Sequence, residues 1–170
     1  MKTYLTKTPI FIQRIFKNYT WRFSLDKKEL YLTFDDGPTP EITEWTLDVL
    51  QQHNAKATFF CIGKNVVENP AIFERIITEG HSIGNHTHNH KNGYHTATKE
   101  YIENTLQAEE QFQEFDVRNS KLFRPPYGKI KRKQAQKLRS LGYKIIMWDV
   151  LSADFDTNIN HKKCLQNVLN

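Results

Sequence analysis

Short apolar runs alternate with amphipathic stretches along most of the chain. Apolar runs bounded by turn-forming residues favour buried strands, whereas apolar residues three and four positions apart favour helices. This alternation predicts an α/β fold with a parallel sheet or barrel, whose functional residues gather at the C-terminal ends of the strands. The strand-like runs span residues 30–34, 57–62, 121–123 and 143–148, and the helix-like stretches include residues 98–116 and 130–141.

Turn and cap residues indicate where several of these helices begin and end. Thr39 is a candidate N-cap with Pro40 at the first helical position, and Pro70 opens the next helix. Gly80 and Gly142 end two helices, because glycine readily adopts the left-handed conformation that follows a helix.

The composition is that of one globular domain. The chain has 170 residues, of which 38% are apolar and 25% charged, and its mean hydropathy is -0.66. The charge pattern predicts a basic N-terminal arm over residues 1–28 and the domain over residues 29–170. The two cysteines, Cys61 and Cys164, form no CxxC pair, so neither a disulfide framework nor a thiolate zinc site is expected.

The basic arm lacks the features of a signal peptide, and no apolar run is long enough to span a membrane. Residues 10–23 mix aromatic residues with Arg14, Lys17 and Arg22. This mixture allows two interpretations, a segment that seeks membrane surfaces or an arm that packs against the domain. The sequence therefore leaves the location undetermined, as cytoplasmic or peripherally membrane-associated.

Two adjacent carboxylates, Asp35 and Asp36, directly follow the first strand and precede a Gly-Pro turn. Neighbouring side chains on a strand point to opposite sides, so one carboxylate can bind a cation while the other contacts a reactant. A hydrogen-bonded turn is the alternative, because Asp-Gly pairs are common in turns.

Five of the seven histidines lie between Glu79 and His95. His86 and His90 are four residues apart, a spacing that in a helical turn places two imidazoles on one side. Two imidazoles and a carboxylate, with positions left for water, are the ligand set of a catalytic metal site. For an isolated pair of histidines at this spacing, a position on the surface is the more usual explanation. This pair follows a strand-like segment and is therefore expected at the same edge of the sheet as the two carboxylates, so we predict metal ligands.

Arg124 lies in the segment FRPPYG, residues 123–128, where two prolines restrict the backbone. A guanidinium held in this way can orient a carboxylate through two hydrogen bonds. A surface turn is the alternative. Asp149, Asp154 and Asp156 follow the last strand and are candidate partners of Arg124.

Three ordered motifs, TFDDGP, HTHNH and RPPYG, resemble the first three motifs of the polysaccharide deacetylases, the NodB homology domain family or carbohydrate esterase family 4. The resemblance covers residues 29 to about 156. It implies a distorted (β/α) barrel with fewer strands than the eight-stranded form. It also implies a hydrolase of non-peptide carbon-nitrogen bonds that uses a divalent metal, usually zinc, to remove N-acetyl or O-acetyl groups from a glycan.

The resemblance implies a role for each matched residue. Asp35 corresponds to the general base and Arg124 to the residue that orients it. The backbone N–H of Tyr127 corresponds to a donor that stabilises the oxyanion. The implied metal ligands are Asp36, His86 and His90. Among the other histidines, His81 is expected to pack or form a hydrogen bond, and His88 and His95 to face solvent or lie at the rim of the site.

Two departures from the family pattern affect these expectations. In the fourth motif Asp154 keeps the carboxylate that supports Arg124, while Phe155 stands where the family has tryptophan and would form an apolar wall of the substrate pocket. The fifth motif, an apolar strand ending in a general-acid histidine, is missing, and His161 is the only histidine after residue 95. We therefore expect a barrel incomplete at the C-terminus, in a chain truncated before the last motif.

The predicted function is metal-dependent deacetylation of a glycan such as peptidoglycan or an N-acetylglucosamine polymer. A catalytically impaired metal- or glycan-binding remnant without the general-acid histidine is the alternative. The basic segment 129–139 allows contact with nucleic acid, but a solvated helix surface is the more usual explanation. An acetylated glycan is thus the expected partner, and no nucleic acid is expected.

Overall fold

The computed structural model describes residues 4–24, 26, 28–117 and 120–169. These residues form two compact units. The larger unit lies within residues 25–145, and the smaller unit combines residues from 1–24 with residues from 146–170.

A five-stranded parallel sheet lies at the centre of the larger unit, and its strands follow one another in chain order. Parallel neighbours need crossover connections, which helices supply here. The α/β fold with a parallel sheet that the sequence predicts is confirmed. The strands are β1 (Thr33–Asp35), β2 (Thr58–Cys61), β3 (Ser82–Asn85), β4 (Leu122–Phe123) and β5 (Lys144–Ile145).

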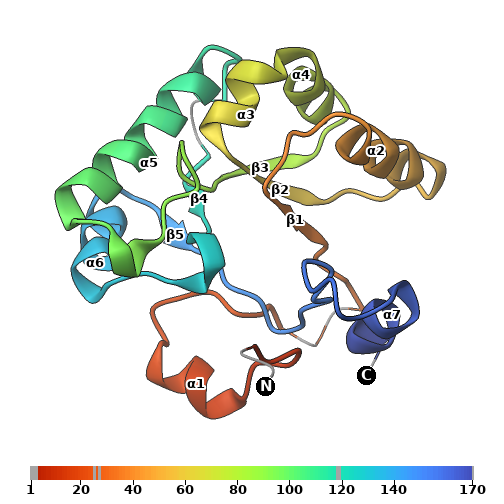
Figure 1. Ribbon diagram of the computed structural model, residues 1–170, viewed down its shortest axis with the longest axis horizontal. Coiled ribbons are helices and arrows are strands. Elements are labelled where there is room, and N and C mark those ends of the chain that lie inside the picture. Colours follow the sequence, from red (N-terminus) through yellow and green to blue (C-terminus); the bar gives the residue numbers. More distant parts are fainter. Residues whose placement is uncertain (1–3, 25, 27, 118–119, 170) are drawn as a thin grey trace. The chain divides into compact units, whose positions relative to one another are not determined.

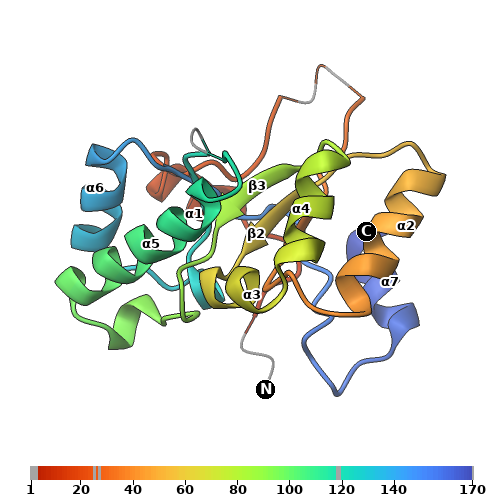
Figure 2. The same cartoon turned by 90° about the horizontal axis from the view of Figure 1, so that it is seen from above.

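Helices of the larger unit form an arc outside the strands (Figure 1). In the view turned by 90°, α3, α4 and α5 lie over the same side of β2 and β3 (Figure 2). The α-helices are α2 (Ile42–Gln52), α3 (Gly63–Glu68), α4 (Pro70–Thr78), α5 (Thr98–Gln113) and α6 (Arg132–Ser140), and the short 3₁₀ helices are η1 (Gly93–His95) and η2 (Pro126–Gly128).

The core of this unit packs between the sheet and α2, α4 and α5. Phe73 of α4 is fully buried, and its ring lies 5.3 Å from that of Phe112 and 5.1 Å from that of Phe115. Phe59 and Cys61 point from β2 into this core, as the alternation of a strand requires. Phe60, between them, points to the other face, which carries the candidate site.

Several elements differ from those that the sequence predicts. Helix α2, the helix that follows β1, begins at Ile42 rather than at Pro40, because Glu41 is the N-cap and forms a capping box with Glu44. Helix α3 was not anticipated, since its six residues are too few to establish a periodic pattern. Strand β5 has two residues instead of the six of the run 143–148, whose later residues belong to the smaller unit.

The smaller unit joins the N-terminal residues to the segment that follows β5. Thr8 donates from its backbone N–H to the carbonyl of Asp149 at 2.8 Å, and Met147 donates to the carbonyl of Thr20 at 2.8 Å. The unit contains helices α1 (Ile10–Ile15) and α7 (His161–Leu169). No helix among the described residues is long and apolar enough to cross a membrane.

Replacing Phe73 by alanine tests the packing of the larger unit. Removing a fully buried ring leaves a cavity, so Phe73→Ala is expected to lower the free energy of unfolding by about 3–5 kcal/mol. Urea denaturation measures the change. Trp45→Ala is the control, because Trp45 is 65% exposed and its loss should change stability by no more than about 0.5 kcal/mol. Equal effects of the two substitutions would contradict this packing.

Candidate active site

The end of β1 separates the two adjacent carboxylates. Asp35 is the last residue of the strand, and Asp36 follows it with φ 69°. This left-handed conformation turns the chain sharply, so that Asp35 reaches Arg124 while Asp36 reaches two histidines. The side-chain amide of Asn65 in α3 donates to the carbonyl of Asp36 at 2.7 Å and holds this turn.

His86 and His90 converge through a loop and not through a helical turn, which corrects the geometry that their spacing suggested. The backbone is left-handed at Thr87 (φ 64°) and again at His90 (φ 51°). Asn104 of α5 accepts hydrogen bonds from two successive backbone N–H groups of this loop, those of His88 and Asn89, at 3.1 and 3.0 Å. The loop is thus held from α5, and both imidazoles turn toward Asp36.

Asp36, His86 and His90 form a compact group of metal-ligating atoms. Nε2 of His86 and Nε2 of His90 lie 3.3 and 3.1 Å from Oδ1 of Asp36. All three ligand atoms lie within 4.8 Å of one another. Two imidazole nitrogens and one carboxylate oxygen suit a divalent ion of the zinc type.

Two further features of this group fit a metal. Nδ1 of His86 lies 2.7 Å from the carbonyl oxygen of Arg124, which can only accept, so Nδ1 carries a proton and Nε2 is the nitrogen that faces Asp36 and would bind a metal after losing its own proton. Burial raises the pKa of Asp36, but the hydrogen bonds and charges of His86 and His90 outweigh burial and lower the pKa below its ordinary value. The carboxylate is therefore ionised near neutral pH.

The second part of the site is an ion pair between a buried arginine and a partly exposed carboxylate. Arg124 follows β4, is 3% exposed, and donates from one guanidinium nitrogen to Oδ1 of Asp35 at 2.7 Å. The same nitrogen donates to the hydroxyl of Thr33 at 2.7 Å. Buried charges need such partners. Thr33 and Asn65 were not identified from the sequence, although Thr33 precedes Asp35 by two residues and so lies on the same side of β1.

Tyr127 lies at the edge of the metal-ligating group. Its backbone is left-handed, with φ 60° and ψ 10°, and interrupts the short helix η2. Its exposed ring lies 4.5 Å from the ring of His90. The structure thus brings Tyr127 beside the ligands, and the role of its backbone N–H stays a prediction.

Asp154 and Phe155 belong to the smaller unit. The hydroxyl of Ser152 donates to Oδ1 of Asp154 at 2.9 Å, and the ring of Phe155 lies 5.2 Å from that of Tyr4. The roles of Asp154 beside Arg124 and of Phe155 as a pocket wall stay predictions.

The remaining histidines of the stretch divide into three kinds. His81 is buried and accepts from the backbone N–H of Ala57 at 3.2 Å, which confirms a packing and hydrogen-bonding role. Burial, with a smaller effect of Lys56, lowers the pKa of His81. His95 is exposed, as expected. His88 is half-buried, with a fully covered Nδ1, so it does not face solvent, and its place at the rim of the site stays a prediction.

The sequence profile of the polysaccharide deacetylases matches residues 23–146 of this chain. The chain belongs to this family. The matched range includes β1, β3 and β4 and every residue of the site that lies in the larger unit.

Two similar relatives of this deacetylase-family chain are named peptidoglycan deacetylases. A peptidoglycan-N-acetylglucosamine deacetylase of Bacillus cereus is 40% identical over 141 residues, which cover 82% of this chain and 51% of the relative. The peptidoglycan-N-acetylmuramic acid deacetylase PdaA of Bacillus subtilis is 34% identical over 134 residues, covering 78% of this chain and 51% of PdaA. The chain thus spans about half the length of these curated relatives.

A solved structure supports the same family fold. The crystal structure of the Bc1960 peptidoglycan N-acetylglucosamine deacetylase superposes with a TM-score of 0.86 at 37% sequence identity. The superposition covers 95% of this chain and 75% of Bc1960.

Replacing a ligand tests the metal-binding group. Asp36→Ala and His86→Ala are each expected to lower the affinity for Zn²⁺ more than about 100-fold, since losing even a group that only orients a ligand costs about 10- to 100-fold. Isothermal titration calorimetry measures the affinity. His95→Ala is the matched control, because His95 is an exposed histidine of the same stretch. Unchanged Zn²⁺ binding by Asp36→Ala would refute the assignment.

Proposed function

We propose that this chain is a metal-dependent hydrolase that removes N-acetyl groups from a glycan of the peptidoglycan or N-acetylglucosamine-polymer type. The observation that carries the proposal is the juxtaposition of the Asp36, His86 and His90 group with the ion pair of Asp35 and Arg124. A cation-binding group beside a second carboxylate outside that group is the arrangement that hydrolysis of an unreactive amide requires.

The side chains of Asp36, His86 and His90 would hold the ion, which we take to be Zn²⁺. A bound divalent ion of this kind polarises a carbonyl oxygen and makes a water molecule more acidic. The hydrogen bond from Nδ1 of His86 to the carbonyl of Arg124 fixes the orientation of one ligand ring.

The chain's own residues supply the proton transfer. Asp35 takes a proton from the attacking water as the water oxygen forms its bond to the acetyl carbonyl carbon. The carbon-nitrogen bond then breaks, and the proton ends on the leaving nitrogen, so the products are acetate and a free amine. Arg124 keeps Asp35 in one orientation through the 2.7 Å hydrogen bond. The backbone N–H of Tyr127 is proposed to stabilise the negative oxygen of the tetrahedral intermediate.

Two residues of the smaller unit are proposed to complete the site, Asp154 as the carboxylate that supports Arg124 and Phe155 as an apolar wall. The names of the relatives support a cell-wall glycan as substrate. A catalytically impaired remnant is the less favoured alternative, because both the metal-ligating group and the pair of base and arginine are present in the larger unit.

Asp35→Asn tests the proposed base. The amide cannot accept the proton from water, so the rate of acetate release from N-acetylglucosamine oligomers is expected to fall about 10²- to 10⁴-fold. Zn²⁺ affinity should be retained, because Asp36 and not Asp35 contacts the histidines. Asp48→Asn, an exposed carboxylate of α2, is the control. Undiminished acetate release by Asp35→Asn would rule out the proposed role.

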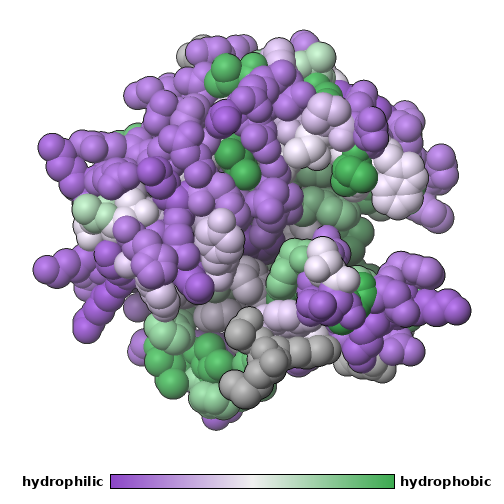
Figure 3. All heavy atoms as spheres, in the orientation of Figure 1, coloured by the Kyte–Doolittle hydropathy of each residue, from purple (hydrophilic) through white to green (hydrophobic). Residues whose placement is uncertain are grey.

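We also propose that the smaller unit binds the surface of membranes that carry anionic lipids. Residues 1–24 contain five lysines and arginines and no acidic residue. Helix α1 has no buried residue, and Ile10, Phe11 and Ile15 are exposed. Apolar side chains gather over α1 on the surface of the molecule (Figure 3). An apolar surface bordered by cations suits the boundary between lipid tails and headgroups.

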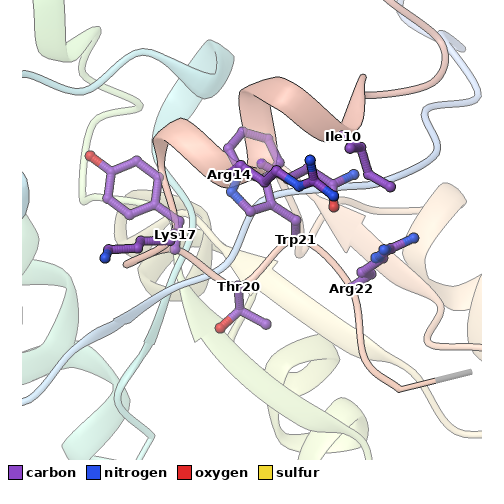
Figure 4. Close-up of a pocket in the computed structure, with 8 residues that line it drawn as sticks. Ile10, Arg14, Lys17, Thr20, Trp21 and Arg22 are labelled. Atoms are coloured by element: carbon purple, nitrogen blue, oxygen red, sulfur yellow. The ribbon is translucent and has the colours of Figure 1, made fainter.

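A cavity of about 430 Å³ adjoins this surface. The basic residues Arg14, Lys17 and Arg22 line it together with Trp21 (Figure 4). The indole N–H of Trp21 donates to the carbonyl of Phe16 at 3.2 Å and thereby connects the two segments that line the cavity. Three cations around an amphipathic ring match the phosphate level of a bilayer, where tryptophan is also enriched.

Charge reversal tests the membrane proposal. Each lysine or arginine near an anionic surface contributes about 1 kcal/mol, so replacing Arg14, Lys17 and Arg22 together by glutamate should weaken binding to phosphatidylserine vesicles about 100-fold or more. Vesicle sedimentation measures the bound fraction. The matched control makes the same reversal at three exposed residues of α6, Arg132, Lys133 and Lys137.

An equal loss of vesicle binding in both triple variants would show a general charge effect and contradict a surface at α1. Binding that is equally strong to neutral phosphatidylcholine vesicles would contradict the anionic headgroup.

A further inference from the structure

Arg124 is held by more than its hydrogen bonds. Its Nη1 donates to both Thr33 and Asp35, and hydrogen bonds from a guanidinium lie in the plane of that group. The central guanidinium carbon lies 4.2 Å from the centroid of the Phe60 ring. A cation at this distance over an aromatic face is attracted by the negative face of the ring, and more strongly where water is excluded. Both side chains are almost fully buried here.

The position of the Phe60 ring depends in turn on Gly84. The two residues are paired on the neighbouring parallel strands β2 and β3. A Cβ atom added at Gly84 would lie 2.3 Å from Cδ1 and 2.4 Å from Cε1 of Phe60. The ring therefore occupies the space that any other residue at position 84 would fill with its side chain. The left-handed backbone that favours glycine is not needed at this position, so the close approach of the ring is the reason for glycine.

The neighbouring residue of β2 provides an internal comparison. Phe59 is 2% exposed and Phe60 is 1% exposed, so the two phenylalanines are equally buried. Phe59 belongs to the core cluster and stacks on Phe34, with ring centroids 5.3 Å apart. Phe60 contacts Arg124 instead. The two residues therefore do not differ in burial. They differ in the face of β2 from which their side chains project.

We infer that Phe60, resting on Gly84, is a positioning residue that packs on the face of the Arg124 guanidinium and thereby helps to hold the orientation of Asp35. The relevance to catalysis rests on the proposed function, in which Asp35 is the base. The stacking of Phe60 and Arg124 is a property of the larger unit alone and is tested without turnover.

The first measurement is the NMR signal of the Arg124 side-chain Nε–H group, assigned by its loss in Arg124→Lys. In the unaltered chain, the signal is expected upfield of those of exposed arginines because of the ring current of Phe60. Phe60→Leu keeps an apolar side chain but removes the ring, so the upfield shift should disappear. Phe59→Leu, the matched control, should retain it. An Arg124 signal that is the same in Phe60→Leu and in the unaltered chain would overturn the inference.

The second variant, Gly84→Ala, displaces the Phe60 ring by a change on the neighbouring strand β3. Its result does not depend on whether Phe60→Leu folds. The added methyl group must displace the ring, and the Arg124 signal is expected to move as it does in Phe60→Leu. In the double variant with both Phe60→Leu and Gly84→Ala, the two shifts of the Arg124 signal should be less than additive. The ring that the methyl group displaces is already absent there. Fully additive shifts would contradict the inference that both substitutions act on Arg124 through the Phe60 ring.

Kinetic measurements then connect the positioning role to the proposed function. Phe60→Leu is expected to lower kcat for acetate release roughly 3- to 30-fold, with KM and Zn²⁺ affinity nearly unchanged. Phe59→Leu should lose thermal stability without this selective fall in kcat. If the unaltered chain releases no acetate while its Arg124 signal responds to Phe60 as described, the proposed function fails and the positioning contact stands. If kcat is equal in Phe60→Leu and Phe59→Leu, the positioning role in catalysis is wrong.

Discussion

The hydrogen bond between Nδ1 of His86 and the carbonyl of Arg124 joins the two parts of the candidate site. On one side of it lies the metal-ligating group, and on the other lies the ion pair of Arg124 with Asp35. A second bond, from the backbone N–H of Arg124 to the carbonyl of Asn85, connects the same two strand ends at 3.0 Å. The ligand ring and the arginine are therefore positioned against each other by adjacent parallel strands, and neither depends on a flexible loop alone.

The backbone of the site is strained where the ligands converge. Asp36, Thr87, His90 and Tyr127 all have left-handed conformations, although none is glycine. Such conformations cost of order 1–3 kcal/mol each and persist only where surrounding contacts impose them. The contacts are present around Thr87, whose N–H donates to Oδ1 of Asn85 at 2.8 Å and whose hydroxyl accepts from the N–H of Lys91 at 3.0 Å. Strain in the loops is thus offset by polar side chains that the loops and the strand ends supply themselves.

The sequence predicted what depends on local pattern and on motif. The parallel α/β fold, the position of the carboxylates at a strand end and the convergence of Asp36, His86 and His90 all follow from apolar runs and motif spacing. The loop geometry at His90 was missed, because a spacing of four residues is shared by helices and by loops with left-handed residues. Asn65 and Asn104 were also missed, since their partners are 29 and 16 residues away in the chain and asparagine has no pattern that marks such contacts.

In the proposed function, cation binding and turnover draw on different units. The contacts described above for the metal-ligating group and for Asp35 come from the larger unit: Thr33 from β1, Asn65 from α3 and Arg124 from the end of β4. Asp154 and Phe155, which the family resemblance adds to the site, belong to the smaller unit. If Asp154 and Phe155 act as proposed, changes in the smaller unit should alter the rate of reaction and substrate binding, whereas the proposed affinity for an ion depends on β1, β3 and the loops that follow them. Loss of acetate release through the smaller unit would then leave the proposed ion binding of the larger unit intact.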